Sequence, residues 1–199
     1  MYKRQRQSGF TGGGINAITK QGTNTTKGSA YTYFNNQFMY GKYSAVRDYA
    51  KSELGQQFTR TFGGTLGGAI VKDKLFYFVS AEAQKESYPA SIYPGYINSY
   101  LTSATAKQIA DKYKEYTGID EAYSQRDVDR KSFGLLARVD WNINQDHKLA
   151  LRYQHNNSFD DNYSPGAYSY VFNNSGYRMN NKTNSIAVSY THLTLPTIC

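Results

Sequence analysis

Short and long connections alternate between the strand-like runs of this 199-residue chain. Apolar and polar residues alternate in five runs, 28–36, 57–70, 75–84, 131–143 and 148–155. The second and third runs, and the fourth and fifth, are joined by tight turns. The other connections are about 20 to 45 residues long, far beyond the usual hairpin loop. A soluble β-sandwich has no reason to sort its connections in this way, whereas an outer-membrane barrel has short periplasmic turns and long extracellular loops. The alternation therefore predicts an all-β fold that forms part of a transmembrane antiparallel barrel.

The composition is compatible with strands that cross a membrane. No run approaches the roughly 20 apolar residues of a membrane helix, and the mean hydropathy is −0.68. A polar average is expected of a barrel, because only every second strand residue meets lipid and the loops are in water. The 20 tyrosines fit the aromatic girdles of such barrels. A soluble, tyrosine-rich β protein is the alternative on composition alone.

The chain shows no pattern of catalytic, metal-binding or nucleic-acid-binding residues. The net charge is +8, but the lysines and arginines are scattered rather than gathered on one face, which does not favour a nucleic-acid partner. His147 and His155 belong to no cluster with metal-ligand spacing. The glycines at 12–14 lack the spacing of a phosphate-binding loop. We expect Asp160 and Asp161 to form a solvated acidic pair in a loop rather than a cation site. The sequence thus predicts no enzyme, cofactor or metal.

Both ends of the chain resemble the translation of a transposase sequencing adapter. Residues 1–5 match one reading of that adapter, and residues 188–197 match the same adapter read outward. We therefore expect the natural segment to span 6–187 within a longer protein, with 188–199 as an adapter-derived tail. A natural tail that contains a final strand is the alternative.

Alternation within the strands assigns each side chain to lipid or to a wet interior. On the fourth run and its partner, the lipid-facing set is Phe133, Leu135, Val139, Trp141 and Leu151. Trp141 lies next to a tight turn, where an interfacial anchor belongs. Glu82, Arg138 and Arg152 fall on the interior face, where we expect the two arginines to lie opposite Glu82 or Asp140. If the apolar set were instead packed inside a two-layer core, the barrel interpretation would be wrong.

The connection at 85–130 is rich in tyrosine and contains one helix pattern. A helix is expected over 104–116, capped by Thr102 and Ser103, with an apolar stripe of Ile109, Tyr113 and Tyr116. Loops on a rigid scaffold commonly carry ligand contacts. Packing of the aromatic residues onto neighbouring loops is the alternative. The candidate ligand-contacting aromatic residues are Tyr88, Tyr93, Tyr96 and Tyr100.

Two segments resemble the TonB-dependent outer-membrane receptors, in particular those with an N-terminal carboxypeptidase-regulatory-like domain. The sequence GGGINAITKQGTN at 12–24 is similar to the end of the plug domain of that family. The sequence FGGTLGGAIVKDKLFYF at 62–78 is similar to its second and third barrel strands with their turn. The resemblance implies a 22-stranded barrel filled by a plug. On this basis 6–27 is the end of the plug, and 28–187 holds the first five or six barrel strands with long extracellular loops.

The same resemblance implies a function in the bacterial outer membrane. Such a receptor binds a nutrient outside the cell and imports it with energy transmitted from the inner membrane by a TonB-type protein. A surface lipoprotein is a further expected partner, and the substrate class, whether small molecule, glycan or peptide, stays open. A passive porin and a secreted glycan-binding or adhesive β domain are the alternatives. The residues that match the plug-to-barrel junction are Gly13, Gly14, Asn16, Thr19, Lys20, Gly22 and Asn24.

Overall fold

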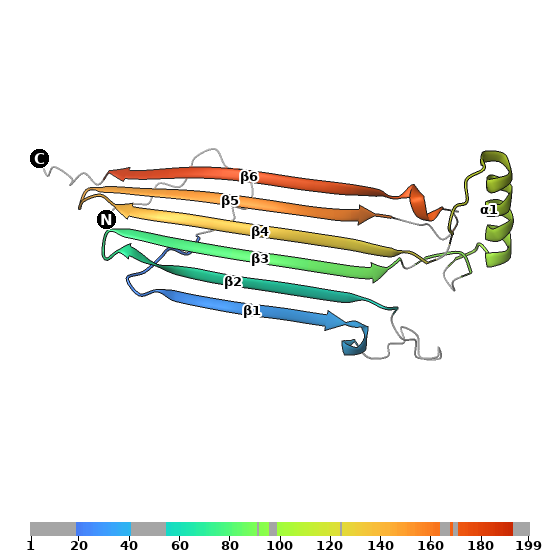
Figure 1. The fold of residues 1–199 in the computed structure, drawn as a ribbon, viewed down its shortest axis with the longest axis horizontal. Coiled ribbons are helices and arrows are strands. Elements are labelled where there is room, and N and C mark those ends of the chain that lie inside the picture. The colour runs from blue at the N-terminus through green and yellow to red at the C-terminus, as the bar shows by residue number, and fades with distance from the viewer. Residues whose placement is uncertain are drawn as a thin grey trace, which may run out of the picture.

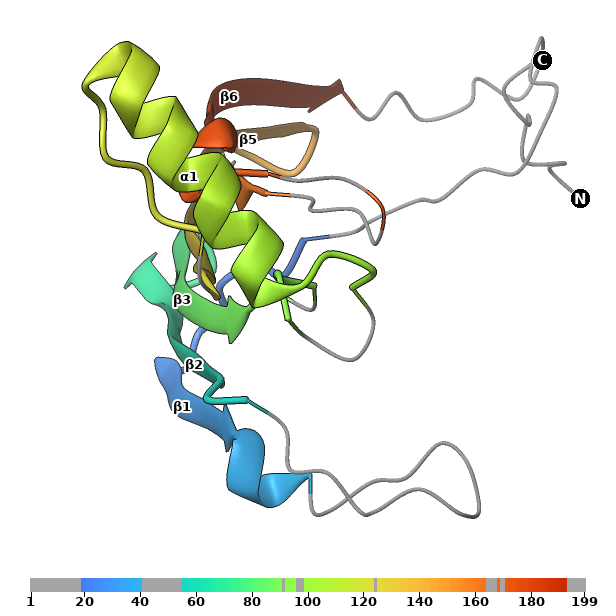
Figure 2. The same cartoon turned by 90° about the vertical axis from the view of Figure 1, so that its right-hand side faces the viewer.

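A single open sheet of six antiparallel strands makes up the fold. The computed structural model describes residues 19–40, 55–90, 92–95, 99–123, 125–163, 168 and 171–192. The strands pair in sequence order, and Figure 2 shows the sheet bent into an open arc. The strands are β1 (Lys27–Asn36), β2 (Phe58–Val71), β3 (Leu75–Pro89), β4 (Asp127–Asn142), β5 (His147–Asn162) and β6 (Tyr177–His192). The predicted all-β, incomplete barrel is confirmed, and the described residues contain no second sheet.

The connections are sorted between the two ends of the strands, as Figure 1 shows. Residues 72–74 and 143–146 form the tight turns at one end. The opposite end carries the connections at 37–57, 90–126 and 163–176, and α1 (Ser103–Thr117) lies there too. The predicted alternation is therefore confirmed. The last of the three long connections is shorter than expected, because β5 continues well beyond its expected end.

Strand pairing divides the side chains between two faces, as the alternation predicted. Phe62, Ala83 and Phe133 are consecutive cross-strand partners on one face, which we call the outer face. Many large apolar residues along this face are exposed, with Phe62 61% and Ile186 71% accessible. Phe133, Val139, Trp141 and Leu151 also lie there and are exposed. The other, inner face carries Phe78, Glu82, Arg138 and Asp140. No two-layer core encloses the apolar set.

The glycines of β2 make room for aromatic rings from the neighbouring strands. The ring of Tyr31 on β1 lies over Gly63, and the ring of Phe78 on β3 lies over Gly67. A Cβ at Gly67 would stand 2.9 Å from Phe78 Cδ2, and Phe78 is only 8% exposed. From its place over Gly63, Tyr31 donates a hydrogen bond to Glu82 Oε2 at 2.5 Å. Glu82 is thus paired with a tyrosine, and of the two acidic partners expected for the interior arginines it is Asp140 that pairs with Arg138.

Three strands extend further toward the long loops than the apolar alternation indicated. β3 runs to Pro89, β4 begins at Asp127 and β5 runs to Asn162. Backbone pairing continues here although the side chains become polar, so the hydrophobic pattern gives no signal. Consequently the expected loop positions of Tyr88, Asp160 and Asp161 are wrong, because all three lie in strands.

The predicted helix exists, but its buried face differs from the expected stripe. The Thr102 side chain accepts a hydrogen bond from the Thr105 amide at 3.2 Å and caps the N-terminus. Gly118, with φ of 73°, closes the C-terminus in the left-handed conformation. Ala106 and Ala110 are the buried residues of α1, whereas Ile109 and Tyr116 are exposed. Within the described part of the chain, no helix is long and apolar enough to cross a bilayer.

Candidate functional site

The chain reaches β1 along the inner face of the sheet, beside the tight turns. We call residues 19–26 the junction segment. Arg138 Nη1 on β4 donates to the Thr19 carbonyl oxygen at 2.9 Å and to Thr19 Oγ1 at 2.8 Å. The guanidinium is itself held by Asp140, with Arg138 Nη2 2.7 Å from Asp140 Oδ1. Both charged side chains are more than four-fifths buried, so this ion pair ties the junction segment to the inner face.

Gly22 permits the junction segment to lie directly against the sheet backbone. A Cβ built there would meet the carbonyl oxygens of Tyr77 and Gly68, and it would lie 3.0 Å from Phe76 Cβ. Gly22 is buried. Any side chain at this position would push the junction segment away from β2 and β3. Close backbone approach is thus the physical reason for glycine here.

Asn24 fastens the other end of the junction segment to the turn between β2 and β3. The amide of Asp73 donates to Asn24 Oδ1 at 2.8 Å, and Asn24 Nδ2 donates to Asp73 Oδ1 at 2.5 Å. Asp73 has a φ of 63°, a left-handed conformation that a non-glycine residue rarely adopts. Asn142 Nδ2 donates to the Asp73 carbonyl oxygen at 3.1 Å. The turn is therefore held from two sides, by the junction segment and by β4.

Four of the predicted junction residues fall within the described residues. Thr19, Gly22 and Asn24 each contact the barrel strands or their turn, and Lys20 is exposed. Gly13, Gly14 and Asn16 lie outside the described residues. The partners Asp73, Arg138 and Asp140 were not predicted as junction residues. The sequence indicated that Arg138 and Asp140 face the interior. It contained no pattern that indicated a contact between β4 and residue 19.

A pocket of about 510 Å³ lies beside the junction segment on the inner face. Residues 21–24 form one wall, and β4 and β5 contribute Arg138, Asp140 and Ala150. Its walls are polar and charged, so it suits water or a polar chain segment rather than an apolar ligand. Among the described residues, no three His, Cys, Asp or Glu side chains gather into a metal site.

The candidate aromatic residues at the long-loop end differ in position. Tyr88 lies on the inner face of β3, with the Arg130 guanidinium 5.3 Å from its ring centre. Tyr100 is 73% exposed and stacks on Tyr168, with ring centres 4.4 Å apart. A hydrogen bond to Tyr100 raises the pKa of the Tyr168 phenol. Tyr93 is partly buried, and Tyr96 lies outside the described residues. Of the three candidates that the structure describes, Tyr100 is thus the one with a largely exposed side chain.

Two of the long loops are docked onto each other. The Asn173 amide donates to the Ala122 carbonyl oxygen at 2.9 Å, and Tyr113 of α1 packs on Phe172 with ring centres 4.8 Å apart. Arg126 donates to the Asn173 carbonyl oxygen. Stacking of Tyr100 on Tyr168 adds to this packing, so Tyr100 is the candidate tyrosine that joins the two loops. The role of the candidate tyrosines in ligand contact stays a prediction.

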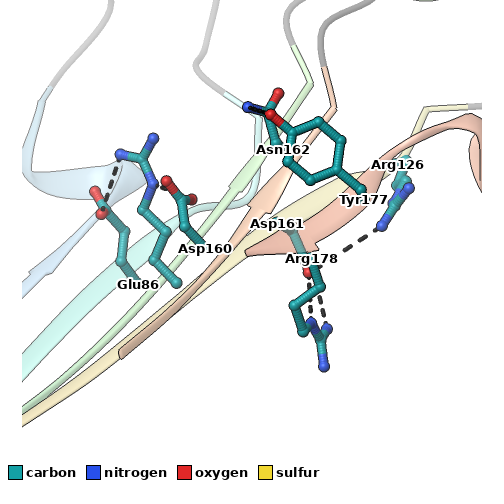
Figure 3. Close-up of polar contacts among 8 residues, drawn as sticks. Glu86, Arg126, Asp160, Asp161, Asn162, Tyr177 and Arg178 are labelled. Carbon is teal, nitrogen blue, oxygen red and sulfur yellow. Dashed lines mark hydrogen bonds and ion pairs between the residues drawn. The ribbon is translucent and has the colours of Figure 1, made fainter. Parts of the chain in front are cut away.

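Ion pairs connect β4, β5 and β6 at the end of the strands that carries the long loops, as Figure 3 shows. Asp161, whose side chain is 7% exposed, accepts from Arg178 Nε at 2.6 Å and lies 3.9 Å from Arg126. Asp160, on the opposite face, accepts from Arg130 Nε at 2.6 Å and is 39% exposed. The expected solvated acidic pair is therefore wrong, because each carboxylate has its own arginine partner. These pairs join neighbouring strands at the rim, the end of the strands where the long loops begin.

Comparison with known proteins adds two similarities. The family described as outer membrane beta barrel domain matches residues 18–97. The chain is 27% identical over 146 residues to the TonB-dependent transporter Oar of Myxococcus xanthus. That alignment covers 71% of this chain but 14% of Oar, so the chain corresponds to a small part of that relative. No solved structure matches the chain.

Proposed function

Since the chain is a β-barrel segment of the bacterial outer membrane and resembles the TonB-dependent receptors, we propose that it is the region of a nutrient transporter where the plug meets the barrel. The transporter binds its substrate outside the cell and imports it with energy from a TonB-type partner. The described residues include the connection between the plug, which moves during transport, and the barrel wall, which does not. The proposal involves no catalysis.

One observation carries this proposal, namely that the junction segment is fixed to the inner face at the short-turn end. Arg138 holds Thr19 on β4 and Asp73 holds Asn24 at the first turn. A segment that enters the barrel interior from that end has the position required of a plug-to-barrel connection. A barrel wall that worked alone as a pore would need no such double attachment on its inner face.

The test compares energised import with passive permeation in the full-length protein. Host cells that lack the receptor gene, and cells that lack the TonB protein, are grown on ferric siderophores, cobalamin, oligosaccharides and peptides as limiting nutrients. We expect both deletions to impair growth on the same nutrient. Growth defects that never coincide would contradict energised transport.

A second measurement separates the transporter from the porin. The purified full-length protein is reconstituted into liposomes, and swelling in small sugars reports any open channel. A plugged barrel is expected to give no more swelling than empty liposomes. Rapid swelling in arabinose by the unmodified protein would favour the passive porin.

A further inference from the structure

A row of three cations crosses the outer face near the long-loop end of the strands. Arg60 on β2 pairs across the sheet with Lys85 on β3, and Lys85 pairs with Lys131 on β4. Phe34 and Phe159 continue the same row on β1 and β5. All three cations are exposed. We call Arg60, Lys85 and Lys131 the cation row.

The cation row lacks acidic partners in the described part of the chain. The ion pairs of this end join Arg130 to Glu86 and Asp160, or Arg126 and Arg178 to Asp161, and none includes a member of the row. Like charges on directly opposed strand positions repel one another. Three unneutralised cations side by side are therefore unfavourable unless an external anion lies against them.

Aromatic rings hold the cations without neutralising them. The Arg60 guanidinium lies 5.0 Å from the Phe58 ring centre, and the Lys85 ammonium lies 5.3 Å from the same ring. Lys131 Nζ is 5.4 Å from the ring centre of Phe159. Such contacts orient the charges and leave their hydrogen-bond donors available. The row is thus arranged in advance for a polyanionic ligand.

The cation row marks the outer limit of the apolar band. The apolar band lies between the cation row and the tight turns. Its first row of cross-strand partners contains Phe62 and Phe133, and its last row contains Leu75 and Trp141. From Phe133 to Trp141 the strand rises about 27 Å, or about 21 Å along the axis of a barrel whose strands tilt by about 40°. That height approaches the apolar band of about 25 Å in outer-membrane barrels. The cations therefore stand at the depth of the lipid headgroups on the extracellular side.

A groove joins the cations to the apolar band. It has a volume of about 600 Å³ and is lined by the cation row together with Phe62, Phe133 and Phe159. Charged residues at one end and aromatic residues below them match a lipid with an anionic headgroup and acyl chains. Arginine and lysine form strong charge-assisted hydrogen bonds with phosphate oxygens.

We propose that the cation row binds the phosphate groups of a phosphorylated glycolipid in the outer leaflet of the membrane. The acyl chains of this lipid lie along Phe62, Ala83 and Phe133. The position on the lipid-facing side selects a membrane lipid over a soluble anion. The bound lipid neutralises the cations and fixes the barrel wall at its extracellular boundary. This site is separate from substrate import, so it stands or falls independently of the proposed function.

The experiment uses the full-length receptor, purified in detergent, and two variants that each lose three positive charges. The test variant is Arg60→Gln with Lys85→Gln and Lys131→Gln. The control variant is Lys72→Gln with Lys74→Gln and Lys148→Gln, which changes exposed lysines at the tight-turn end. Binding of bis-phosphorylated lipid A is measured by native mass spectrometry, with dephosphorylated lipid A and inorganic phosphate as further probes. Heat-modifiable migration on gels verifies that each barrel is folded.

We expect the test variant to bind phosphorylated lipid A at least about tenfold more weakly than the unmodified receptor, because three charge-assisted contacts are lost. The control variant and the charge-preserving variant Arg60→Lys with Lys85→Arg and Lys131→Arg retain binding. Dephosphorylated lipid A is expected to bind weakly to all of them. Equal binding of phosphorylated lipid A by the test variant and the unmodified receptor would overturn the proposal.

Two further outcomes also decide the question. Competition by inorganic phosphate as effective as that by lipid A would contradict a lipid site and indicate a soluble anion. If the test variant fails to fold, Lys85→Gln alone replaces it, with a smaller loss of lipid A binding expected. Unchanged binding by folded Lys85→Gln, with Lys72→Gln as its control, would then count against the site.

Discussion

At the residue scale, a buried ion pair gives the junction segment its position. Arg138 and Asp140 face the interior of a barrel that would otherwise be wet there, yet both are largely buried beneath Thr19. Hydrogen bonds that involve a charged group contribute about 1.5–3 kcal/mol each to stability. Arg138 therefore has a large influence on whether the junction segment stays on the sheet.

Replacement of Arg138 by glutamine is expected to release the start of the junction segment. In the full-length receptor with a nitroxide spin label on a cysteine that replaces the exposed Lys20, Arg138→Gln should raise the ratio of mobile to immobile label about tenfold, since one charged contact of this kind is lost. The control is Arg152→Gln, which changes the cross-strand partner of Arg138 on the same face. Equal mobility of the label in both variants, measured by electron paramagnetic resonance, would show that Arg138 does not hold the segment.

Gly22 offers a steric test of the same attachment. Gly22→Ala places a methyl group against the backbone oxygens of β2 and β3, and overpacking of this kind usually costs about 1–3 kcal/mol. Urea unfolding of the full-length receptor in lipid vesicles measures the loss. Gly28→Ala is the matched control, because its Cβ would meet Leu66 Cδ1 and the Thr65 carbonyl oxygen at 3.3 Å each, and no atom closer than that. A loss for Gly28→Ala as large as that for Gly22→Ala would contradict the steric explanation.

At the scale of the elements, ion pairs join neighbouring strands at the end that carries the long loops. Asp161 is almost completely buried between Arg178 and Arg126, whereas Asp160 is much more exposed beside Arg130. Removal of one member of a buried pair leaves the other charge uncompensated. An exposed pair contributes about 0–1 kcal/mol.

The two neighbouring aspartates therefore predict unequal effects on the rim. Asp161→Asn should accelerate hydrogen exchange of the amides in 171–180 by about tenfold or more, because it leaves Arg178 and Arg126 without a carboxylate. Asp160→Asn should change the same amides by less than about threefold. Hydrogen exchange followed by mass spectrometry of the receptor in nanodiscs gives both values. A larger effect for Asp160→Asn would contradict the burial argument.

The alternation of side chains predicted five strands and both faces, because hydrocarbon imposes a period of two on every strand that crosses it. It did not predict the parts of β3, β4 and β5 nearest the long loops, because these parts lie beyond the lipid and their side chains do not alternate between apolar and polar. The buried alanines of α1 were also missed, since the large residues were expected to be inside. The contacts between Arg138 and Thr19 join positions far apart in sequence, so local patterns contain no information about them.

At the scale of the whole molecule, the described sheet has two unpaired edges and one apolar face. β1 and β6 each pair on one side only within the described residues, and the outer face exposes Phe62, Leu66 and Val188. Unpaired edges and lipid-facing surfaces promote aggregation in water. The segment therefore depends on further strands and on lipid for a stable structure.

Expressed alone, residues 6–187 are expected to aggregate in water and to disperse in detergent. Size-exclusion chromatography with light scattering in both solvents measures this difference. The full-length receptor in the same detergent serves as the control for a closed barrel. A monodisperse, cooperatively melting monomer of the segment in water would favour the secreted β domain instead.

The double attachment of the junction segment has a mechanical consequence. Thr19 precedes Asn24 in the chain, so tension applied from the upstream side reaches the contact with Arg138 before it reaches the contact with Asp73. The two contacts then break one after the other, as in peeling. The peak force on the junction segment is therefore lower than if both contacts broke together. A smaller force is thus needed to detach the segment than if the two contacts shared the load.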